Sequence, residues 1–507
     1  MDKKKCRVLL FHSLSARDSY SDSDFRIAPI GLFFIAGALR EHGFEPLIIP
    51  VLLPVFLEDS AISADYKKEL RKKIHNFNPQ YIGYSFRNLY NFGPPVIKTN
   101  TLVDFFCISQ DLPVIDFLKN CSGAPVIAGG SGFSLAPEFY MTYLNLDYGI
   151  QGEGEHSMVM LLEKLNQGEE VDSVPGLVFR RDSIIHKNDR KNCDNDSLWK
   201  MDVSCLDNLT EIYHDNGGYG SIQTKRGCSF NCSYCVYPYL EGQKYRLRPV
   251  SQIVSEIRTY LQDYKIQHIY FVDSVFSSPT DHSIAIVDAI IESRLDIKWY
   301  AYVNPSGLTE ALLQKYRGSG CAGLVLTLES GSDKVLKYLK KGFTTKDSVI
   351  AIENLVNAKI PFEVSMLTGS PEETENTLNE TLLFCHDYLK NIPVTFTPGV
   401  WMHPVSSIFS DFHNTSNQDV DVLSRLILSN DFKTHNELHY FFTKQKNRLG
   451  LIQAFSEAVD KEPMWFIIGK DIVPDYHAGV MKFPNNDKIE RYCRPWYSAI
   501  LRDTGSN

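Results

Sequence analysis

The chain has 507 residues, of which 43% are hydrophobic and 22% are charged. This length allows two or three domains with buried cores, and the composition excludes a largely disordered chain. The formal net charge of −9 argues against a broad nucleic-acid-binding surface, although it is compatible with a local basic patch. No uninterrupted apolar run reaches the roughly 18 to 20 residues of a membrane-spanning helix, so we expect a cytoplasmic protein without a membrane span.

The N-terminal part of the chain alternates short apolar runs with amphipathic stretches. Such an alternation indicates βαβ units and a parallel sheet, so we predict a doubly wound, Rossmann-like α/β domain with a polar linker over residues 1–195. A sheet of this kind binds ligands at the carboxyl ends of its strands. The runs that we predict as strands are residues 7–12, 45–53, 81–86, 124–130 and 148–152.

A short hairpin around Asp182 and a polar stretch precede a second alternation. Over residues 196–404 we predict six strands, each except the last followed by a helix. This pattern indicates a (β/α)6 partial TIM barrel, whose active site lies at the C-terminal ends of the strands. The final segment, residues 405–507, is rich in aromatic residues with helical periodicity, and we predict a mostly helical C-terminal domain there.

Three of the 11 cysteines, Cys228, Cys232 and Cys235, lie just after the first strand of the predicted barrel. Their C-x3-C-x2-C spacing lacks the second pair that a structural zinc site normally needs. Three unbound thiols in one loop would be open to oxidation. Three thiolates can instead hold a [4Fe-4S] cluster and leave one iron open for another ligand. The other eight cysteines are scattered, which does not indicate a disulfide framework.

The run CSFNCSYC resembles the CxxxCxφC motif of radical S-adenosylmethionine (SAM) enzymes, with Tyr234 before the last cysteine. The resemblance implies that Cys228, Cys232 and Cys235 are the metal ligands of a [4Fe-4S] cluster and that the open iron binds SAM. It also implies that reduction of the cluster cleaves SAM to methionine and a 5′-deoxyadenosyl radical. The electron would come from an external donor such as flavodoxin or ferredoxin.

The resemblance continues along the predicted barrel, in residues 245–257, 269–276, 327–342 and 366–374. These segments resemble the parts of the family that surround the methionine, ribose and adenine groups of SAM. The resemblance implies that Glu329 binds the ribose. The residues to which it gives a role in binding the cofactor are Tyr234, Asp273, Glu329, Ser330, Ser365 and Gly369.

Some residues of these segments have a structural alternative. Glu329 would suit the N-terminus of a helix that begins near Ser332, because acidic residues are favoured there. Asp273 would satisfy the polar groups of a loop at the end of its strand. Arg248 would equally suit a pair with Glu256 on the helix surface instead of a contact with the cofactor.

An α/β domain ahead of such a barrel resembles the cobalamin-binding class of the same superfamily, in residues 28–46, 82–88, 126–138 and 147–155. Glycines in these segments leave room for a large flat ligand, although similar turns occur in any doubly wound domain. None of the histidines lies in a D-x-H-x-x-G pattern, so the resemblance implies base-off cobalamin without a histidine ligand. The loop of Arg87 and Asn88 would then lie beneath the cobalt. The residues expected to bind cobalamin are Arg87, Asn88, Gly129, Gly130, Gly132, Gly152 and Glu153.

We therefore predict a cobalamin-dependent radical SAM C-methyltransferase. The 5′-deoxyadenosyl radical would abstract hydrogen from an unactivated carbon of a small-molecule or peptide substrate, and the substrate radical would take a methyl group from methylcobalamin. The sequence does not indicate which compound that substrate is. Two alternatives stay open: a radical rearrangement or cyclisation without net methylation, and a non-catalytic cobalamin or iron-sulfur sensor.

Overall fold

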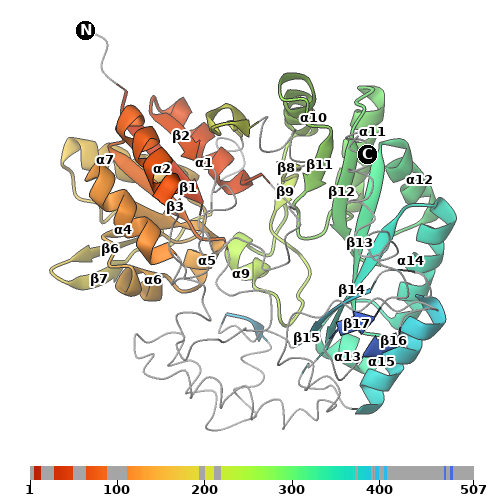
Figure 1. The fold of residues 1–507 in the computed structure, drawn as a ribbon. Helices are drawn as coiled ribbons and strands as arrows, with labels where there is room; N and C mark the ends of the chain where they lie inside the picture. The colour runs from red at the N-terminus through yellow and green to blue at the C-terminus, as the bar shows by residue number, and fades with distance from the viewer. Residues whose placement is uncertain are drawn as a thin grey trace. The chain divides into compact units, whose positions relative to one another are not determined.

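The structure is a computed structural model, and its described part divides into two compact units, which we treat separately (Figure 1). The first unit contains the described residues up to Leu209 except Ala28, and the second contains Ala28 and the described residues from Tyr219 onward. The residues that the structure describes are 5–12, 28–49, 64–87, 111–192, 200–209, 219–368, 370, 375–389, 392, 394–398, 405–407, 473–475 and 480–482.

The first unit is built on one seven-stranded sheet with the order β2-β1-β3-β4-β5-β6-β7. The first five strands in this order are parallel, and the last two are antiparallel. The strands are β1 (Arg7–His12), β2 (Glu45–Ile49), β3 (Tyr81–Ser85), β4 (Val126–Gly129), β5 (Tyr148–Ile150), β6 (Leu177–Arg181) and β7 (Ile184–Lys187). The helices are α1 (Ile30–Glu41), α2 (Ala64–Phe77), α4 (Asp111–Ser122), α5 (Gly130–Leu135), α6 (Pro137–Tyr143), α7 (Glu155–Gln167) and the 3-10 turn η2 (Val203–Cys205).

This strand order confirms the predicted doubly wound domain and defines its ligand-binding edge. The 2-1-3-4-5 order is that of flavodoxin-like sheets, in which ligands bind at the carboxyl ends of the strands near the switch between β1 and β3. Strands β1 and β3 are almost continuously buried, as expected for parallel strands covered on both faces. The predicted hairpin is also confirmed, because Asp182 and Ser183 both have positive φ in the two-residue turn between β6 and β7.

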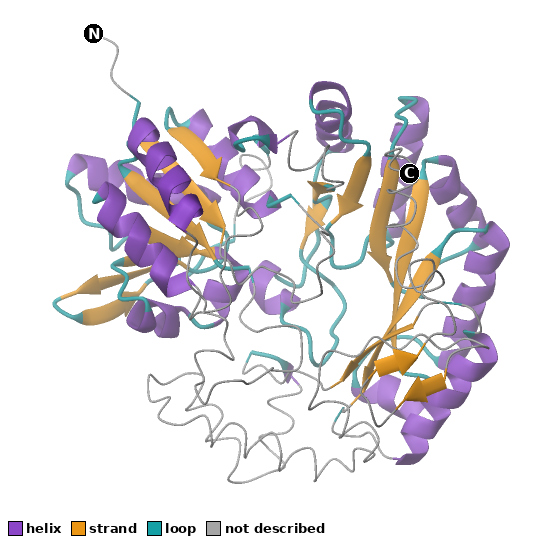
Figure 2. Cartoon of the chain, in the orientation of Figure 1, coloured by secondary structure: helices purple, strands orange, loops and turns teal. Residues whose placement is uncertain are grey.

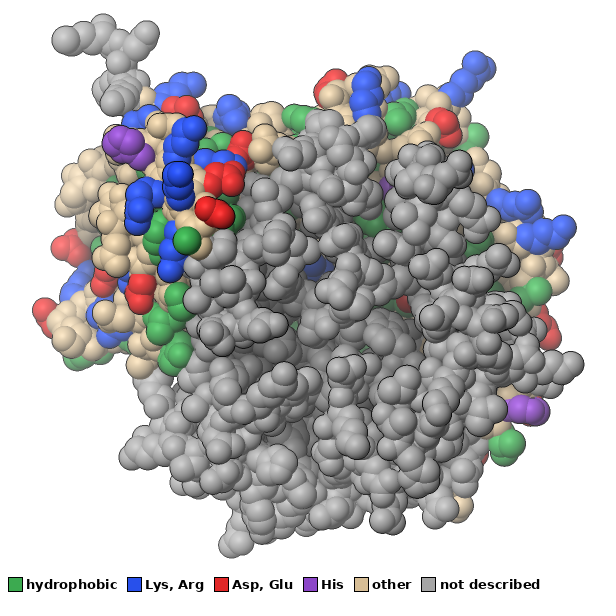
Figure 3. Space-filling view, in the orientation of Figure 1, with side chains coloured by type: hydrophobic (Ala, Val, Ile, Leu, Met, Phe, Trp, Pro, Cys, Tyr) green, Lys and Arg blue, Asp and Glu red, His purple; other side chains and the backbone are tan. Residues whose placement is uncertain are grey.

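Helix α2 shows how an acidic chain can carry a local basic surface. Leu70 and Ile74 are buried on one face of the helix, while Lys68, Arg71 and Lys72 are exposed. This is the usual amphipathic pattern of a helix at a protein surface. Figure 3 shows basic side chains gathered over this region of the first unit.

The second unit contains a six-stranded, fully parallel sheet with the order β15-β14-β13-β12-β11-β8. Helices follow the strands along one face of the sheet (Figure 2). The strands are β8 (Gly220–Ile222), β11 (His268–Phe271), β12 (Lys298–Val303), β13 (Cys321–Glu329), β14 (Phe362–Thr368) and β15 (Val394–Pro398). The main helices are α10 (Val250–Arg258), α11 (Thr280–Glu292), α12 (Glu310–Gly318), α14 (Thr345–Ala358) and α15 (Glu375–Tyr388).

The predicted partial barrel is confirmed, because strands that follow one another in the chain are also neighbours in this sheet and run parallel.

Four shorter elements connect the sheet to the site: β9 (Lys225–Arg226), α9 (Tyr237–Glu241), β10 (Arg246–Leu247) and α13 (Asp333–Tyr338). The helix-covered face of the sheet is aromatic, with Trp299 packed against Phe271, Phe276 and Tyr316. This packing fixes the central strands, from whose ends the site residues project.

The predicted mostly helical domain at residues 405–507 lies largely outside the described residues. In that segment the structure describes residues 405–407 and an antiparallel strand pair, β16 (Val473–Asp475) and β17 (Val480–Lys482). The predicted domain boundaries stay predictions. Among the helices of the described ranges, none is long and apolar enough to cross a membrane.

Candidate active site

The three cysteines lie in the loop between β9 and α9, at the carboxyl side of β8. We call residues 227–236 the cysteine loop. Its first residue, Gly227, has φ +86°, and a Cβ there would lie 2.2 Å from the carbonyl oxygen of Lys244, so this turn requires glycine. The Cys228 N–H donates to the Gly242 carbonyl at 3.1 Å, and the short β9–β10 ladder closes the base of the loop.

The three cysteines of the cysteine loop are free thiols that form no disulfide. Burial raises the pKa of all three, that of Cys235 to about 12, and the thiols of Cys232 and Cys228 contribute to the rise at Cys235. Binding iron would therefore displace protons from them. No three Cys, His, Asp or Glu side chains in the described part of the chain converge to hold a single metal ion. A cubane cluster has a different requirement, because each of its irons takes one thiolate, so three cysteines in one short loop can supply three of its four ligands.

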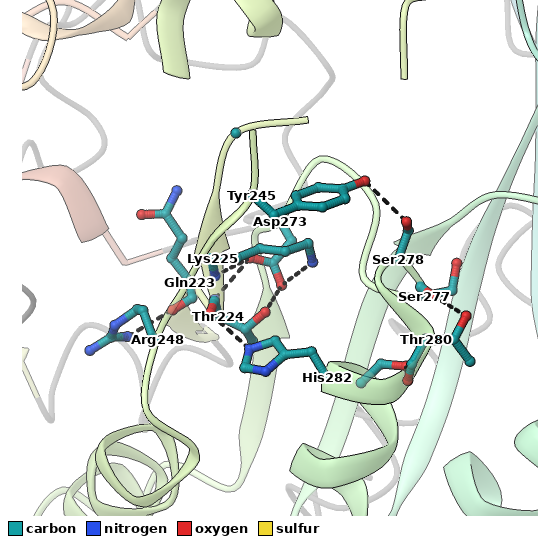
Figure 4. A network of polar contacts seen from close by, with 12 residues as sticks. Gln223, Thr224, Lys225, Tyr245, Arg248, Asp273, Ser277, Ser278, Thr280 and His282 are labelled. Carbon is teal, nitrogen blue, oxygen red and sulfur yellow. Dashed lines mark hydrogen bonds and ion pairs between the residues drawn. The ribbon is translucent and has the colours of Figure 1, made fainter. Parts of the chain in front are cut away.

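Asp273, just after β11, holds the segment that leads into the cysteine loop (Figure 4). Its Oδ1 accepts the backbone N–H groups of Thr224 and Lys225 at 2.8 and 3.2 Å, and its Oδ2 accepts the Thr224 hydroxyl at 2.6 Å. The Lys225 Nζ lies 3.5 Å from Oδ2. Asp273 thus satisfies the polar groups of the chain that leads into the cysteine loop, as the structural alternative expected. A contact between Asp273 and the cofactor stays a prediction.

Arg248 secures the same segment from the side of α10. Its guanidinium donates to the Gln223 carbonyl at 2.7 Å and forms a two-pronged ion pair with Glu256, so the pairing expected from the sequence is present. The pair is not on the surface as expected, because Arg248 is 1% exposed. The Gln223 side chain and the Gly227 N–H both donate to Glu241, which links α9 to the start of the loop.

Glu329, Tyr234 and Lys341 form a buried polar triad against the other side of the cysteine loop. The Tyr234 hydroxyl and the Lys341 Nζ donate to Glu329 Oε1 at 3.1 and 3.3 Å, and the Lys341 Nζ lies 3.2 Å from the Tyr234 hydroxyl. Glu329 has φ +73° where the β13 register shifts, an uncommon conformation for a residue with a side chain. Its carboxylate is engaged with the triad rather than with the N-terminus of α13, where Ser332 takes the N-cap position.

Two other predicted SAM-binding residues are described by the structure: Ser330 directly follows β13, and Ser365 lies on β14. The Ser330 hydroxyl is buried, bonded to Thr381 Oγ1 at 2.9 Å, and accepts the Ser332 N–H at 3.1 Å. Ser365 is half-buried on β14, in register with Thr327 on β13. Gly369 lies outside the described residues. The roles of these residues in binding SAM stay predictions.

In the first unit, the predicted cobalamin residues that the structure describes lie at or after the carboxyl ends of β3, β4 and β5. The Gly132 N–H donates to the Phe86 carbonyl at 2.9 Å, and Ser131 donates to the Arg87 carbonyl, so the ends of β3 and β4 are joined. The Gly152 N–H donates to Ser134 Oγ at 2.9 Å, which brings the end of β5 to α5. Arg87 is exposed and Glu153 half-buried at this edge, whereas Asn88 lies outside the described residues.

The glycines at this edge differ in how much space the fold leaves for a Cβ atom. A Cβ on Gly130, which has φ +92°, would lie 2.3 Å from the Phe86 carbonyl oxygen, so the fold itself requires this glycine. Among the described residues, a Cβ on Gly129 would be in ordinary van der Waals contact with the Ile150 carbonyl oxygen at 3.8 Å, so the fold there does not require glycine. Gly152 also has positive φ, with the Arg190 side chain 3.7 Å from its missing Cβ. The absence of a side chain at Gly129 is compatible with the approach of a flat cofactor, and its role in binding cobalamin stays a prediction.

Sequence reasoning missed two buried lysines beside the cysteine loop, Lys225 and Lys341. Each is 3% exposed, whereas lysine is almost never fully buried without a partner. Lys225 directly precedes the Arg226-Gly227 pair of the motif, and Lys341 lies in the segment that resembles the ribose-binding part of the family. Lys337 and Lys340, which lie close to Lys341 in the chain, are exposed. No local pattern distinguishes a buried lysine from these.

Comparison with known proteins agrees with this geometry. Residues 222–385 match the Radical SAM superfamily, and they include the cysteine loop and most of the six-stranded sheet. The chain is 24% identical over 442 residues to tryptophan 2-C-methyltransferase from Streptomyces laurentii, covering 73% of this chain and 69% of that protein.

Two solved structures have the same fold over most of the chain. The radical SAM methyltransferase TsrM from Kitasatospora setae, solved with tryptophan and a SAM analogue, matches with a TM-score of 0.67 at 21% identity and covers 81% of this chain and 76% of its own. The cobalamin-dependent SAM radical enzyme OxsB, solved with aqua-cobalamin, matches with a TM-score of 0.62 at 16% identity over 96% of this chain and 65% of its own. These likenesses establish the fold.

Residues 222–385, which include the cysteine loop, therefore form a radical SAM domain. The resemblance to the cobalamin-binding class of radical SAM enzymes that was noted in the sequence is confirmed by this match together with the named relatives.

Proposed function

We propose that this protein is a cobalamin-dependent radical SAM C-methyltransferase that acts on a small-molecule or peptide substrate. The observation that carries the proposal is the cysteine loop, held at the carboxyl ends of the barrel strands in a chain that also has a flavodoxin-like unit. Bound together, the [4Fe-4S] cluster, SAM and cobalamin would supply a radical and a methyl group for transfer to carbon. TsrM, whose fold this chain shares, was also solved with cobalamin and a [4Fe-4S] cluster bound.

Residues of the second unit would hold the cluster and SAM, and residues of the first unit would bind cobalamin. Cys228, Cys232 and Cys235 would hold the cluster, with Glu329 and Tyr234 beside it for SAM. Gly129 and the exposed Arg87 would contact cobalamin at the edge of the first sheet. A barrel that excludes water would protect the radical until it meets the methyl donor, which is the chief contribution a protein can make to such chemistry. The reducing electron would come from an external donor such as flavodoxin or ferredoxin.

The first test is anaerobic reconstitution of the protein with iron, sulfide and hydroxocobalamin, beside a variant with Cys228, Cys232 and Cys235 all changed to Ala. We expect about four irons and one cobalt per wild-type chain, and cobalt without iron in the variant. Iron without cobalt in the wild type would contradict the cobalamin-dependent mechanism.

A second test separates methyl transfer from the alternative reactions. The reconstituted enzyme is reduced with dithionite and supplied with SAM and candidate substrates. Methyl transfer predicts both 5′-deoxyadenosine and S-adenosylhomocysteine during turnover. Productive turnover with 5′-deoxyadenosine alone would indicate a rearrangement or cyclisation without methylation, and a loaded protein that cleaves no SAM would indicate a sensor.

A further inference from the structure

The end of α13 turns the Lys341 side chain toward the cysteine loop. Lys340 has φ +55°, and the N–H groups of Lys340 and Lys341 donate to the carbonyls of Lys337 and Leu336, both at 3.1 Å. This is the Schellman pattern of a helix C-terminus, with Lys340 in the left-handed position usually taken by glycine. The turn leaves Lys340 exposed and Lys341 buried.

The Lys341 ammonium group is held against the cysteine loop through Tyr234. Its Nζ lies 3.2 Å from the Tyr234 hydroxyl and 5.7 Å from the centre of the Tyr234 ring, and Tyr234 lies between Cys232 and Cys235 in the loop. The Ser233 N–H donates to the Leu339 carbonyl at 2.9 Å, which ties the loop to the same helix end. The ammonium group therefore cannot move away from the loop without breaking buried contacts.

The buried charge of Lys341 lies against the segment that carries two of the three cysteines, because its Nζ contacts the side chain of Tyr234, which stands between Cys232 and Cys235. The Glu329 carboxylate lies 3.3 Å from the same Nζ and brings the opposite charge to this place. A charge in a buried, low-dielectric setting is felt more strongly than one at the surface, which solvent screens.

We infer that Lys341 makes the proposed [4Fe-4S] cluster easier to reduce and that Glu329, its ion-pair partner, restrains this effect. Reduction adds one electron to the cluster, taken from an external one-electron donor, and leaves the cluster more negative. A fixed positive charge stabilises that form, and nearby charge is one of the factors that set the potential of such clusters. Lys341 is thus a positioning residue that acts through the cluster, and the inference rests on the proposed function because it requires the cluster.

The test is a potentiometric titration of the reconstituted cluster without SAM, at one fixed pH, followed by electron paramagnetic resonance. We expect the midpoint potential of Lys341→Met to shift to more negative values and that of Glu329→Gln to more positive values. Lys341→Arg retains the charge and should stay close to wild type. Lys340→Met removes the same charge from the exposed neighbour and should leave the potential unchanged.

Opposite shifts at Lys341 and Glu329 separate a charge effect from loosened packing, which has no reason to reverse sign between the two. The inference would be wrong if Lys341→Met matched Lys340→Met, or if Glu329→Gln shifted the potential in the negative direction. If Lys341→Met failed to hold iron, the inference would be judged on the other two variants: a positive shift of the midpoint potential in Glu329→Gln with an unchanged potential in Lys341→Arg would support it, and any other result would contradict it. A wild-type protein that takes up no iron would contradict the proposed function itself, whereas a loaded cluster with unmoved potentials contradicts this inference alone.

Discussion

Lys225 and Asp273 form a buried ion pair in which Asp273 has other polar partners and the Lys225 ammonium group has no other hydrogen bond among the described residues. The Nζ and Oδ2 atoms are 3.5 Å apart, and both side chains are buried. Asp273 also accepts three hydrogen bonds from Thr224 and the Lys225 backbone. Besides this ion pair, the Lys225 Nζ has no hydrogen-bond partner among the described residues, and it lies 6.0 Å from the centre of the Tyr245 ring.

This asymmetry predicts that Asp273→Asn destabilises the second unit more than Lys225→Met. The Asn variant leaves a buried ammonium group unpaired, with an expected loss of about 3 to 5 kcal/mol, while the Met variant leaves Asp273 with its hydrogen bonds and should cost about 1 to 2 kcal/mol. Urea unfolding followed by tryptophan fluorescence measures both. Asp263→Asn, at an exposed carboxylate of the same unit, is the matched control.

The double variant tests the same relationship. Asp273→Asn combined with Lys225→Met should recover part of the stability that Asp273→Asn loses, because the unpaired charge is removed. Simple addition of the two losses would show that the ion pair has no part in the coupling.

Arg248 should not be replaceable by lysine. Arg248→Lys keeps the charge but cannot bond the Gln223 carbonyl and both Glu256 oxygens at once. We expect a loss of about 2 to 3 kcal/mol in the unfolding free energy and reduced iron uptake, since Gln223 leads into the cysteine loop. Arg258→Lys on the exposed side of α10 is the control and should change neither quantity. Normal stability and iron content in Arg248→Lys would show that the bidentate pair does not support the loop.

Gly129 and Gly130 should respond differently to alanine. Gly130→Ala forces a Cβ against the Phe86 carbonyl at positive φ and should destabilise the first unit by about 2 to 4 kcal/mol. Gly129 has extended backbone, and a Cβ there would meet the Ile150 carbonyl oxygen only at an ordinary contact distance of 3.8 Å, so Gly129→Ala should cost less than about 1 kcal/mol. If Gly129 contacts cobalamin, the folded Gly129→Ala protein should take up less hydroxocobalamin. Full uptake would remove Gly129 from the binding surface.

His282 predicts a pH-dependent contribution to stability. Burial lowers the pKa of its ring, and the charge of Lys225 acts in the same direction, while the hydrogen bond with the Thr224 carbonyl at 3.1 Å opposes both. Because the folded pKa lies below the unfolded one, unfolding takes up a proton as the pH falls below about 6.5. The contribution of His282 is therefore complete above that pH and is lost below it.

The corresponding measurement compares unfolding at pH 7.5 and pH 5.5. Between pH 7.5 and pH 5.5, the free energy of unfolding of the wild type should fall by up to about 1 kcal/mol more than that of His282→Gln. Partial solvent screening of the ring limits the effect. His386→Gln, at an exposed histidine, should behave as wild type. An equal loss in His282→Gln and wild type would show that this ring does not titrate with unfolding.

The sequence was informative where a property is local or repeats along the chain. The alternation of apolar runs predicted both parallel sheets, because strands buried on both faces are continuously apolar over a few residues, as β1 and β3 are. The cysteine spacing predicted the loop because all three ligands come from one short segment. The Asp182 turn could be predicted for the same reason.

The sequence left open every question that depends on groups distant in the chain. Glu329 suited a helix N-terminus as well as a binding site, and only the approach of Lys341 and Tyr234 shows where its carboxylate is used. Asp273 suited a loop or a cofactor, and the fold brings Thr224 to it. Arg248 was expected on a helix surface, but it is buried under the chain that it supports.

By itself, then, the sequence determined the two α/β units, their order and the position of the cysteine loop, because these depend on periodicity and spacing that neighbouring residues set. Only the tertiary structure decided which charges surround that loop. Lys340 and Lys341 are adjacent and chemically identical, yet the turn that ends α13 exposes one and buries the other against Glu329. A charge acts on a site through its distance and its burial, and both are properties of the folded chain.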